Sequence, residues 1–307
     1  MSEKVLLVYG GFSAEREVSI SSKNDIAAAL KSKGYTVIEH DLTDVWTFLD
    51  TLKTEKPDVV YNGLYGNWGE DGELQGLLDM LQIPYTHSGL KASALGMDKY
   101  LTKLLASAAG VKVAQGEKTT AAAYLQNGTK ISYPYVVKPV CDGSSVGVYI
   151  VHNAEEAKRV TYSTPNLPIL IEPYIAGREL TVMCLDGKAS VITELKTDCS
   201  FYDYQAKYTT GKTHHILPAE LPENIAEICK RYTEIVYNAL DCHTIARCDF
   251  RYNEKDGVVL LEINTNPGMT ALSLVPEQAK YLGISFADLC DILVKNLRFC
   301  SVWILGT

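Results

Sequence analysis

The sequence lacks an apolar run long enough for a membrane-spanning helix. One helical crossing needs about 20 apolar residues, whereas the apolar run near the N-terminus, Val5–Tyr9, has five. A run of five is also too short for a signal peptide and suits a buried first strand. We therefore expect a cytoplasmic protein that does not bind membranes.

Cysteine and histidine motifs for metal binding or redox chemistry are missing as well. None of the eight cysteines forms a Cys-x-x-Cys pair, and the six histidines show no metal-ligand spacing. Without an export signal, free buried thiols in a reducing compartment are the better interpretation.

The chain has no excess of basic residues. Its net charge is −8 and its pI is about 5.3. Nucleic-acid-binding proteins usually present a basic face, so we expect no nucleic-acid partner. A local basic pocket for a phosphate ligand is still compatible with this charge.

Two common nucleotide-binding motifs are absent. The sequence has neither Gly-x-Gly-x-x-Gly, which argues against a dinucleotide-dependent oxidoreductase, nor Gly-x4-Gly-Lys-Ser/Thr, the P-loop. A nucleotide site in this chain would therefore have to be built in another way.

The pattern of elements divides the chain into three segments. Residues 1–92 alternate strand and helix, which predicts a parallel sheet with covering helices. Residues 93–175 predict a small α+β lobe with a helix at 154–161. Residues 176–307 predict a second α+β lobe, which includes a polar, tyrosine-rich connection at 196–221. Connections of this length inside a compact domain are often lids or binding loops.

The strongest chemical signal lies on two strands expected at 244–252 and 258–264. Side chains alternate along a strand, so Arg247 and Asp249 share one face, and so do Glu262 and Asn264. If the strands pair as a hairpin, two carboxylates and an amide oxygen converge, which suits Mg²⁺ at a nucleotide site. An ordinary solvated sheet face is the competing interpretation.

Lysines and small residues give a second signal. Lys138 ends a predicted strand, and the glycine- and serine-rich turn 142–147 follows it. Small residues let backbone amides approach an anion closely. A hairpin turn with an incidental lysine is the alternative. Lys99 stands at a predicted helix start, where most lysines are solvated.

Two further segments have both a chemical and a plain structural interpretation. Glu15 follows Gly10-Gly11 at a helix N-terminus, where it can bind a substrate ammonium or simply interact with the helix dipole. The aromatic run 201–208, inside the long connection, can close over a ligand and exclude water or anchor its own loop.

Taken in order, the motifs resemble those of the D-alanine–D-alanine ligases, members of the ATP-grasp superfamily. The resemblance covers nearly the whole chain and implies a three-domain ATP-grasp fold, with an N-terminal parallel-sheet domain and two α+β lobes that clamp ATP. The residues that carry it are 10–19, 69–76, 94–99, 137–139, 143–147, 201–208, 262–270 and 273–276.

The resemblance implies an ATP site. Glu172 and the backbone near Ile175 bind the adenine side, and Glu179 binds the ribose. Three lysines reach the phosphates, namely Lys99, Lys138 and Lys207. Three oxygen ligands hold two Mg²⁺ ions, or Mn²⁺ in their place: Asp249, Glu262 and Asn264.

It also implies a site for two D-alanines. Glu15 holds the ammonium of the first, and Ser144 with Tyr208 forms a hydrogen-bonded link that closes the loop. The tetrahedral oxyanion and the second D-alanine are bound by four residues: Arg247, the Gly268 amide, Ser273 and Leu274.

The implied function is ATP-dependent joining of two D-alanines through a D-alanyl phosphate, for peptidoglycan precursors of the cell wall, by a homodimer. A ligase of the same fold with D-lactate or D-serine as acceptor is the alternative. One position departs from the family, which usually has His-Gly where this chain has Tyr65-Gly66.

Overall fold

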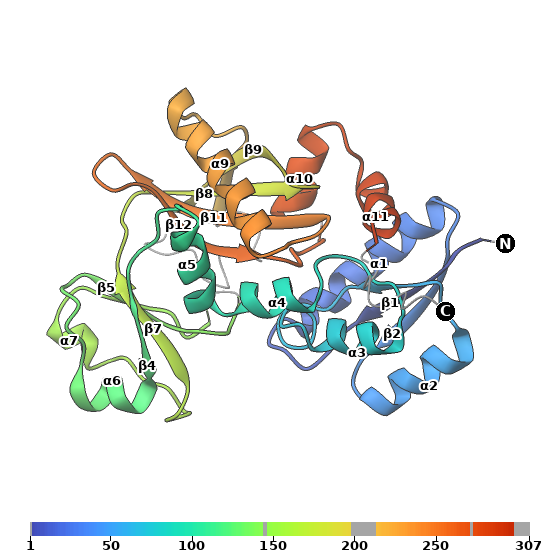
Figure 1. The fold of residues 1–307 in the computed structure, drawn as a ribbon, viewed down its shortest axis with the longest axis horizontal. Helices are drawn as coiled ribbons and strands as arrows, with labels where there is room; N and C mark the ends of the chain where they lie inside the picture. Colours follow the sequence, from blue (N-terminus) through green and yellow to red (C-terminus); the bar gives the residue numbers. More distant parts are fainter. Residues whose placement is uncertain (1, 144–145, 198–212, 271–272, 298–307) are drawn as a thin grey trace, which may run out of the picture.

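The computed structural model describes residues 2–143, 146–197, 213–270 and 273–297. Three sheets form the framework, and the molecule is elongated (Figure 1), with the first sheet at one end and the second at the other. No helix within these described ranges has the length and apolarity that a bilayer crossing requires.

The first sheet is parallel, with strand order β2-β1-β3. Its central strand β1 (Lys4–Tyr9) is buried on both faces, as parallel sheets require. Val5 and Leu7 enter one apolar cluster, and Leu6 and Val8 enter another on the opposite face. The remaining elements are α1 (Arg16–Ser32), β2 (Thr36–Asp41), α2 (Val45–Glu55), β3 (Val59–Asn62) and α3 (Glu73–Leu81).

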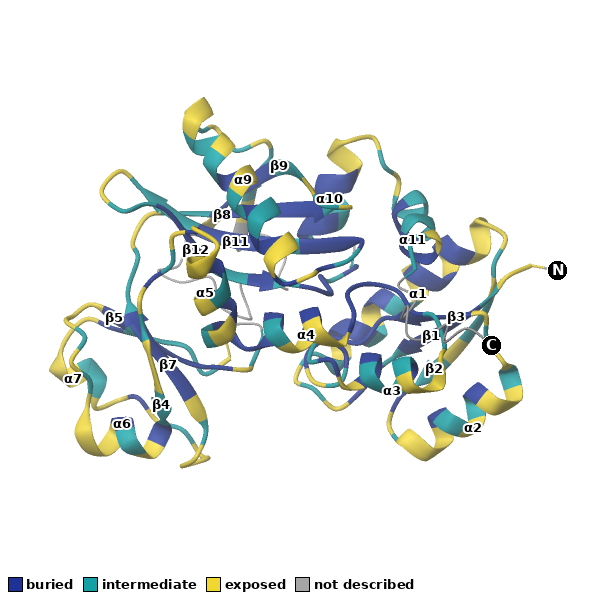
Figure 2. Ribbon diagram, in the orientation of Figure 1, coloured by how far each residue is buried: buried dark blue, intermediate teal, exposed yellow. Residues whose placement is uncertain are grey.

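The second sheet is antiparallel, with strand order β4-β7-β5-β6, and forms a lobe of its own. The strand predicted before the glycine-rich turn is confirmed as β5, and it pairs with β6, which follows the turn. Two short elements that the sequence did not predict complete the lobe (Figure 2): β4, which is polar and has no buried residue, and α6, which buries only Ala121 and Tyr124. Its elements are β4 (Glu117–Thr120), α6 (Ala121–Asn127), β5 (Tyr135–Pro139), β6 (Tyr149–Val151), α7 (Ala154–Ala157) and β7 (Pro168–Pro173).

The helix predicted at 154–161 is wrong in length, because α7 ends at Ala157. The backbone leaves the helix through short-range bonds, such as that from the Val160 amide to the Ala157 carbonyl. Val160 is then buried in the lobe's apolar cluster, with Tyr162 packed against it. Tertiary burial therefore outweighs the helical propensity of this segment.

The third sheet is antiparallel, with strand order β10-β9-β8-β11-β12. Its hairpin of β11 and β12 confirms the pairing predicted from the sequence. Helices α5 and α9 pack together, and both contact β12. The elements are α4 (Leu90–Met97), α5 (Lys99–Ala108), β8 (Arg178–Leu185), β9 (Lys188–Thr197), β10 (Thr213–Ile216), α9 (Glu223–Ala239), β11 (Ile245–Asn253), β12 (Gly257–Asn264), α10 (Leu274–Tyr281) and α11 (Phe286–Lys295).

The last helix completes the core of the first sheet. Leu289 and Leu293 of α11 lie in the same apolar cluster as Ile26 and Leu30 of α1, and Figure 1 shows the two helices side by side. Segments from the two ends of the chain therefore share one core.

A buried glutamine joins α10 to the third sheet. The pairing register of β8 and β9 shifts at Met183, and the Met183 amide donates to Gln278 Oε1 at 2.7 Å. Gln278 Nε2 donates to the Thr181 carbonyl at 3.0 Å and to Thr193 Oγ1 at 2.9 Å. Gln278 is fully buried, so it satisfies backbone groups that water cannot reach.

We predict that Gln278→Met lowers the free energy of unfolding by about 2–4 kcal/mol, because it leaves buried polar groups without partners. Urea denaturation measures the change. Gln126→Met, at an exposed position of α6, is the matched control and should change stability by no more than about 0.5 kcal/mol. Equal effects of the two substitutions would contradict the anchoring role of Gln278.

Candidate active site

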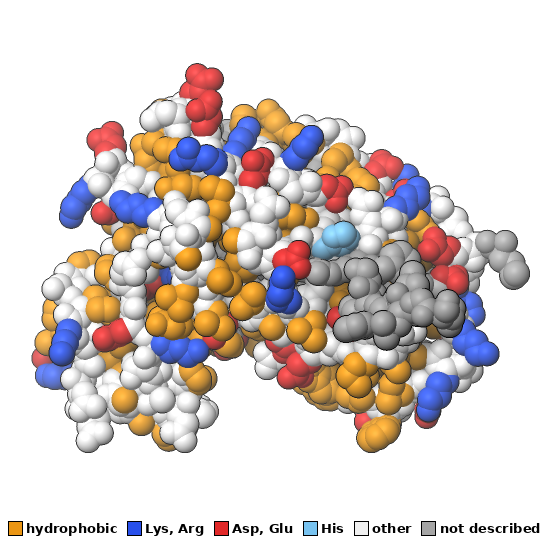
Figure 3. Space-filling view, viewed as in Figure 1, with side chains coloured by type: hydrophobic (Ala, Val, Ile, Leu, Met, Phe, Trp, Pro, Cys, Tyr) orange, Lys and Arg blue, Asp and Glu red, His pale blue; other side chains and the backbone are white. Residues whose placement is uncertain are grey.

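One pocket lies where the second and third sheets meet the loops that follow β1 and β3. The space-filling view shows an indentation between the lobe of the second sheet and the rest of the molecule (Figure 3). All thirteen predicted site residues that the structure describes line the pocket: Glu15, Lys99, Lys138, Glu172, Ile175, Glu179, Arg247, Asp249, Glu262, Asn264, Gly268, Ser273 and Leu274. The other three, Ser144, Lys207 and Tyr208, lie outside the described residues.

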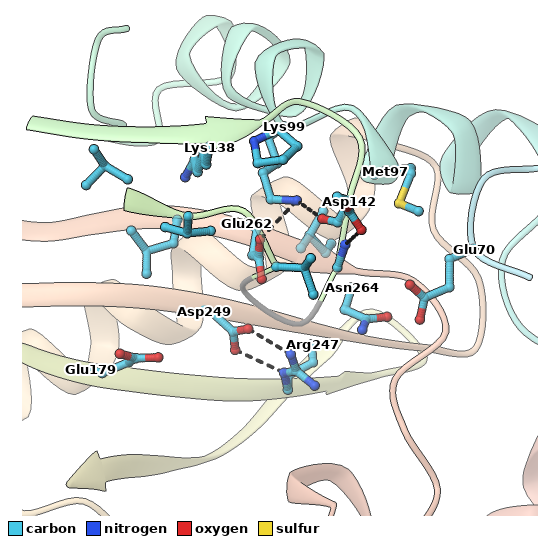
Figure 4. A pocket seen from close by; sticks show the side chains of 18 of the residues that line it. Glu70, Met97, Lys99, Lys138, Asp142, Glu179, Arg247, Asp249, Glu262 and Asn264 are labelled. Atoms are coloured by element: carbon cyan, nitrogen blue, oxygen red, sulfur yellow. Dashed lines mark hydrogen bonds and ion pairs between the residues drawn. The ribbon is translucent and has the colours of Figure 1, made fainter. Parts of the chain in front are cut away.

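The register of β11 and β12 brings four polar side chains together. Arg247 is directly opposite Asn264, and Asp249 is directly opposite Glu262. Arg247 donates to both oxygens of Asp249, from Nε at 3.0 Å and from a terminal nitrogen at 2.8 Å (Figure 4). Thr181 on β8 adds a hydrogen bond of 2.6 Å to Asp249 Oδ1. Hydrogen bonds therefore fix Asp249 on the face of the sheet that it shares with Glu262, called the acidic face below. A freely solvated sheet face is the wrong interpretation.

The donor set fits a hard cation. Asp249 and Glu262 are cross-strand neighbours, and Asn264 adds an amide oxygen two residues further along β12. Mg²⁺ prefers such oxygen ligands and keeps positions for water and phosphate. Among the described residues, no three His, Cys, Asp or Glu side chains lie close enough to form a metal site. The amide oxygen of Asn264 is the group that could serve beside the two carboxylates as a third protein ligand.

Lys99 is a buried residue of the pocket, so the expectation of a solvated lysine is wrong. It opens α5, whose N-cap Asp98 accepts the Leu101 amide at 2.9 Å. The Lys99 ammonium donates to the backbone carbonyl of Asp142, in the glycine-rich turn, and lies 3.5 Å from Glu262 Oε2 (Figure 4). One cation thus connects the turn of the second sheet to the acidic face of the third.

A second buried cluster has two lysines and one carboxylate. Lys138 of β5 donates to Glu172 Oε1 at 2.7 Å, and Lys103 of α5 donates to Glu172 Oε2. The side chains are only 9%, 5% and 3% exposed for Lys138, Lys103 and Glu172. Both oxygens of Glu172 are therefore occupied by ammonium groups.

The charges in this cluster do not balance. Burial lowers the pKa of Lys103 to about 8, because Glu172 only partly offsets desolvation and Lys138 adds repulsion. Burial alone would raise the pKa of Glu172, but the two lysines outweigh it and the net pKa is lowered. The cluster thus carries a positive charge in excess, next to the part of the pocket lined by Ile175.

Sequence reasoning missed Lys103, although a signal was present. Lys103 follows Lys99 by four residues, so the two side chains lie on one helix face. A lysine on the buried side of an amphipathic helix needs a carboxylate partner, and Glu172 is that partner.

Two carboxylates lie at the other end of the pocket. Glu15 is the N-cap residue of α1, and its amide donates to Ser13 Oγ at 3.1 Å. A Cβ placed on Gly143 would come within 3.0 Å of Glu15 Oε2, so the glycine-rich turn approaches this carboxylate closely. Burial raises the pKa of Glu70 well above its usual value, and the nearby Glu15 raises it further. Glu70 was not predicted, although it stands in the 69–76 motif.

The loop after β12 and the start of α10 close the pocket. Ser273 Oγ accepts the Thr270 amide at 3.0 Å and lies 2.8 Å from Thr270 Oγ1. A Cβ on Gly268 would lie 3.0 Å from Ser273 Oγ, so glycine suits this close approach. At the opposite edge, Glu179 is paired with Arg251 at 2.8 Å.

Comparisons with known proteins point to one family. Residues 105–295 match the family model described as the D-ala D-ala ligase C-terminus. A D-alanine–D-alanine ligase from Ruegeria sp. (strain TM1040) is 46% identical over 296 residues, which cover 95% of each chain.

Solved structures agree with this result. The D-alanine–D-alanine ligase of Bacillus anthracis complexed with ATP superposes with a TM-score of 0.81 at 30% identity, over 96% of this chain and 97% of the other. The VanG D-Ala:D-Ser ligase of Enterococcus faecalis gives 0.78 at 25% identity, over 96% of this chain and 99% of the other.

We predict that Glu172→Gln lowers the free energy of unfolding by about 3–5 kcal/mol, because it leaves two buried ammonium groups without a counter-charge. The double variant with Lys103→Met should recover part of this loss. Glu155→Gln removes a carboxylate from an exposed i,i+3 pair and should cost less than about 1 kcal/mol. Denaturant unfolding compares the three variants, and a loss below about 1 kcal/mol for Glu172→Gln would contradict the role of Glu172 as the counter-charge of both lysines.

Proposed function

The chain belongs to the D-alanine–D-alanine ligase family, and we propose that its pocket joins two D-alanines with the energy of ATP. The predicted ATP-grasp fold and ligase function are confirmed by the relatives. The observation that supports the proposal for this chain is that one pocket contains all the required groups. It is lined by lysines for phosphate, oxygen ligands for a cation and a carboxylate for an ammonium group.

The nucleotide is proposed to lie between the second and third sheets. Glu172 and Ile175 border the adenine side, and Glu179 borders the ribose. Lys99 and Lys138 reach the phosphates. Lys138 is a buried ammonium group in a cluster with an excess of positive charge, and a phosphate group beside Lys138 would offset this charge.

Mg²⁺ is proposed to be held by Asp249, Glu262 and Asn264. When bound, it neutralises charge that develops as the γ-phosphoryl group moves. Lys99 contacts Glu262, so a protein cation lies beside the proposed metal ligands. This supports a phosphate position between the Lys99 ammonium and the metal ion. Mn²⁺ has the same preference for oxygen ligands.

The reaction needs two steps because a carboxylate is a poor electrophile. The γ-phosphoryl group is transferred to the carboxylate of the first D-alanine, whose ammonium is held by Glu15. The amine of the second D-alanine, held near Ser273 and Leu274, then attacks the acyl phosphate and releases phosphate. Arg247 and the Gly268 amide stabilise the oxyanion, a contribution typically worth about 10²–10³ in rate for one donor.

Several assignments around this activity are also proposals. The three sheets support a division into domains at 1–92, 93–175 and 176–307, although α4 and α5 contact β12 of the third sheet. We propose a cytoplasmic homodimer that supplies peptidoglycan precursors. Ser144 and Tyr208 are proposed to form the link that closes the loop over the site, and Lys207 is proposed to reach the transferred phosphate.

D-alanine is favoured over D-lactate or D-serine as the acceptor. The D-alanine ligase from Ruegeria shares 46% of residues with this chain, whereas the D-Ala:D-Ser ligase shares 25%. We therefore predict that purified enzyme with ATP, Mg²⁺ and D-alanine forms D-alanyl-D-alanine and releases phosphate in equal amounts. Mass spectrometry of the product and a phosphate assay measure both.

The controls for this experiment distinguish the assignment of the substrate from the ability of the fold to bind ATP. L-alanine should give no dipeptide, and D-alanine with D-lactate should give no depsipeptide. Glu15→Gln should lower turnover with D-alanine at least about 100-fold, because the substrate ammonium loses its carboxylate partner. Binding of ATP without turnover of any D-amino acid would overturn the substrate assignment.

Binding of nucleotide should be coupled to proton uptake. If phosphate attracts Lys138 away from Glu172, the carboxylate serves Lys103 alone and the pKa of Lys103 rises from about 8. Binding of ADP with Mg²⁺ at pH 8.5 should then take up roughly half a proton. Calorimetry in buffers of different ionisation enthalpy measures this number. Lys103→Met should abolish the uptake, and proton release in the wild-type enzyme would contradict the mechanism.

A further inference from the structure

The hydroxyl of Tyr65 joins the first sheet to the loop that carries Gly268. Tyr65 follows β3 and is only 4% exposed. Its Oη accepts the amide of Met269 at 3.0 Å and donates to Ser22 Oγ of α1 at 3.1 Å. Met269 is the residue directly after Gly268 and is itself 1% exposed. A single hydroxyl therefore connects segments more than 200 residues apart.

A neighbouring hydrogen bond fixes the same loop. Asn266 Nδ2 donates to the backbone carbonyl of Leu64 at 2.7 Å, and the Asn266 amide donates to Asn264 Oδ1 at 2.9 Å. The loop after β12 is thus held at two points against the segment after β3. Asn266 fixes its beginning, and Tyr65 fixes it on the far side of Gly268.

The main chain of Tyr65 also contacts the segment that carries Glu15. Ser13 Oγ donates to the Tyr65 carbonyl at 2.6 Å and accepts the amide of Glu15. Through its hydroxyl and its carbonyl, Tyr65 therefore connects the proposed ammonium site with the loop of the proposed oxyanion donor. These two sites hold opposite ends of the first D-alanine.

We propose that Tyr65 is a positioning residue, whose hydroxyl binds the amide that follows Gly268 and so holds Gly268 at the distance from Glu15 that acyl transfer requires. This inference rests on the proposed function. An oxyanion donor works through its placement relative to the reacting carbon, and displacements of about 1 Å can cost 10²-fold in rate. The group serves as an un-ionised phenol, because burial raises the pKa of Tyr65 to about 12.

Tyr65→Phe removes this hydroxyl and keeps the ring. We expect kcat to fall roughly 10–100-fold, because the Gly268 amide loses its fixed position. The KM for ATP should change less than about twofold, since Tyr65 does not border the proposed nucleotide position. Affinity for a phosphinate analogue of the tetrahedral intermediate should weaken by the same factor as kcat, and the shape of the pH–rate profile should not change.

Tyr61→Phe is the matched control. It also removes a buried hydroxyl from the same region, but Tyr61 Oη contacts Cys290 Sγ at 3.9 Å and not the loop after β12. Its kcat should stay within about twofold of the wild-type value. A thermal scan of both variants shows whether each remains folded at the assay temperature.

The outcomes are distinct. A Tyr65→Phe enzyme with wild-type kcat and wild-type affinity for the phosphinate would overturn the positioning role while leaving the proposed function intact. Loss of the alkaline limb of the pH profile would also overturn it, because the phenol would then act in proton transfer. Absence of dipeptide from the wild-type enzyme would overturn the proposed function and this inference together.

Discussion

The pairing register of β11 and β12 determines which side chains meet in the pocket. Arg247 lies opposite Asn264, and Asp249 lies opposite Glu262. A shift by one residue would turn each of these side chains to the other face of the sheet. Cys248, Phe250, Leu260 and Ile263 fill the apolar cluster beneath the strands, so burial of the apolar side chains enforces the register that the polar ones need.

Pairing of opposite charges within the pocket complements this geometry. Asp249 is paired with Arg247, Glu262 lies near Lys99, and Glu172 is shared by Lys103 and Lys138. Phosphate and a metal ion can replace these internal pairings, because both kinds of partner are charged and fit the same atoms. The internal ion pairs thus hold the side chains in place, and the proposed ligands would replace these pairs on binding.

The sequence predicted what depends on local pattern. Alternation along 244–252 and 258–264 was enough to place Arg247, Asp249, Glu262 and Asn264 on one surface, and the hairpin is confirmed. The parallel first sheet followed from its strand–helix alternation. Motif order then predicted the family, which the relatives confirm.

The sequence did not predict what depends on contacts between distant segments. Lys103 and Glu172 are 69 residues apart, and the bond from the Met269 amide to Tyr65 spans 204 residues. Helical spacing can place Lys103 on the buried side of its helix, but no local period identifies a partner so far away in the sequence. The strand β4 has four residues and no apolar one, and the helix α6 has only seven residues, so neither gives a clear periodic pattern. The end of α7 is set by the burial of Val160.

A crystal structure of the protein with ADP and Mg²⁺ tests the central claim most directly. The account predicts adenine beside Glu172 and Ile175, and phosphates between Lys99 and Lys138. It also predicts a metal ion on Asp249, Glu262 and Asn264, with Lys138 turned from Glu172 toward phosphate. Nucleotide bound elsewhere, or a metal ion that does not contact Asp249, would contradict it.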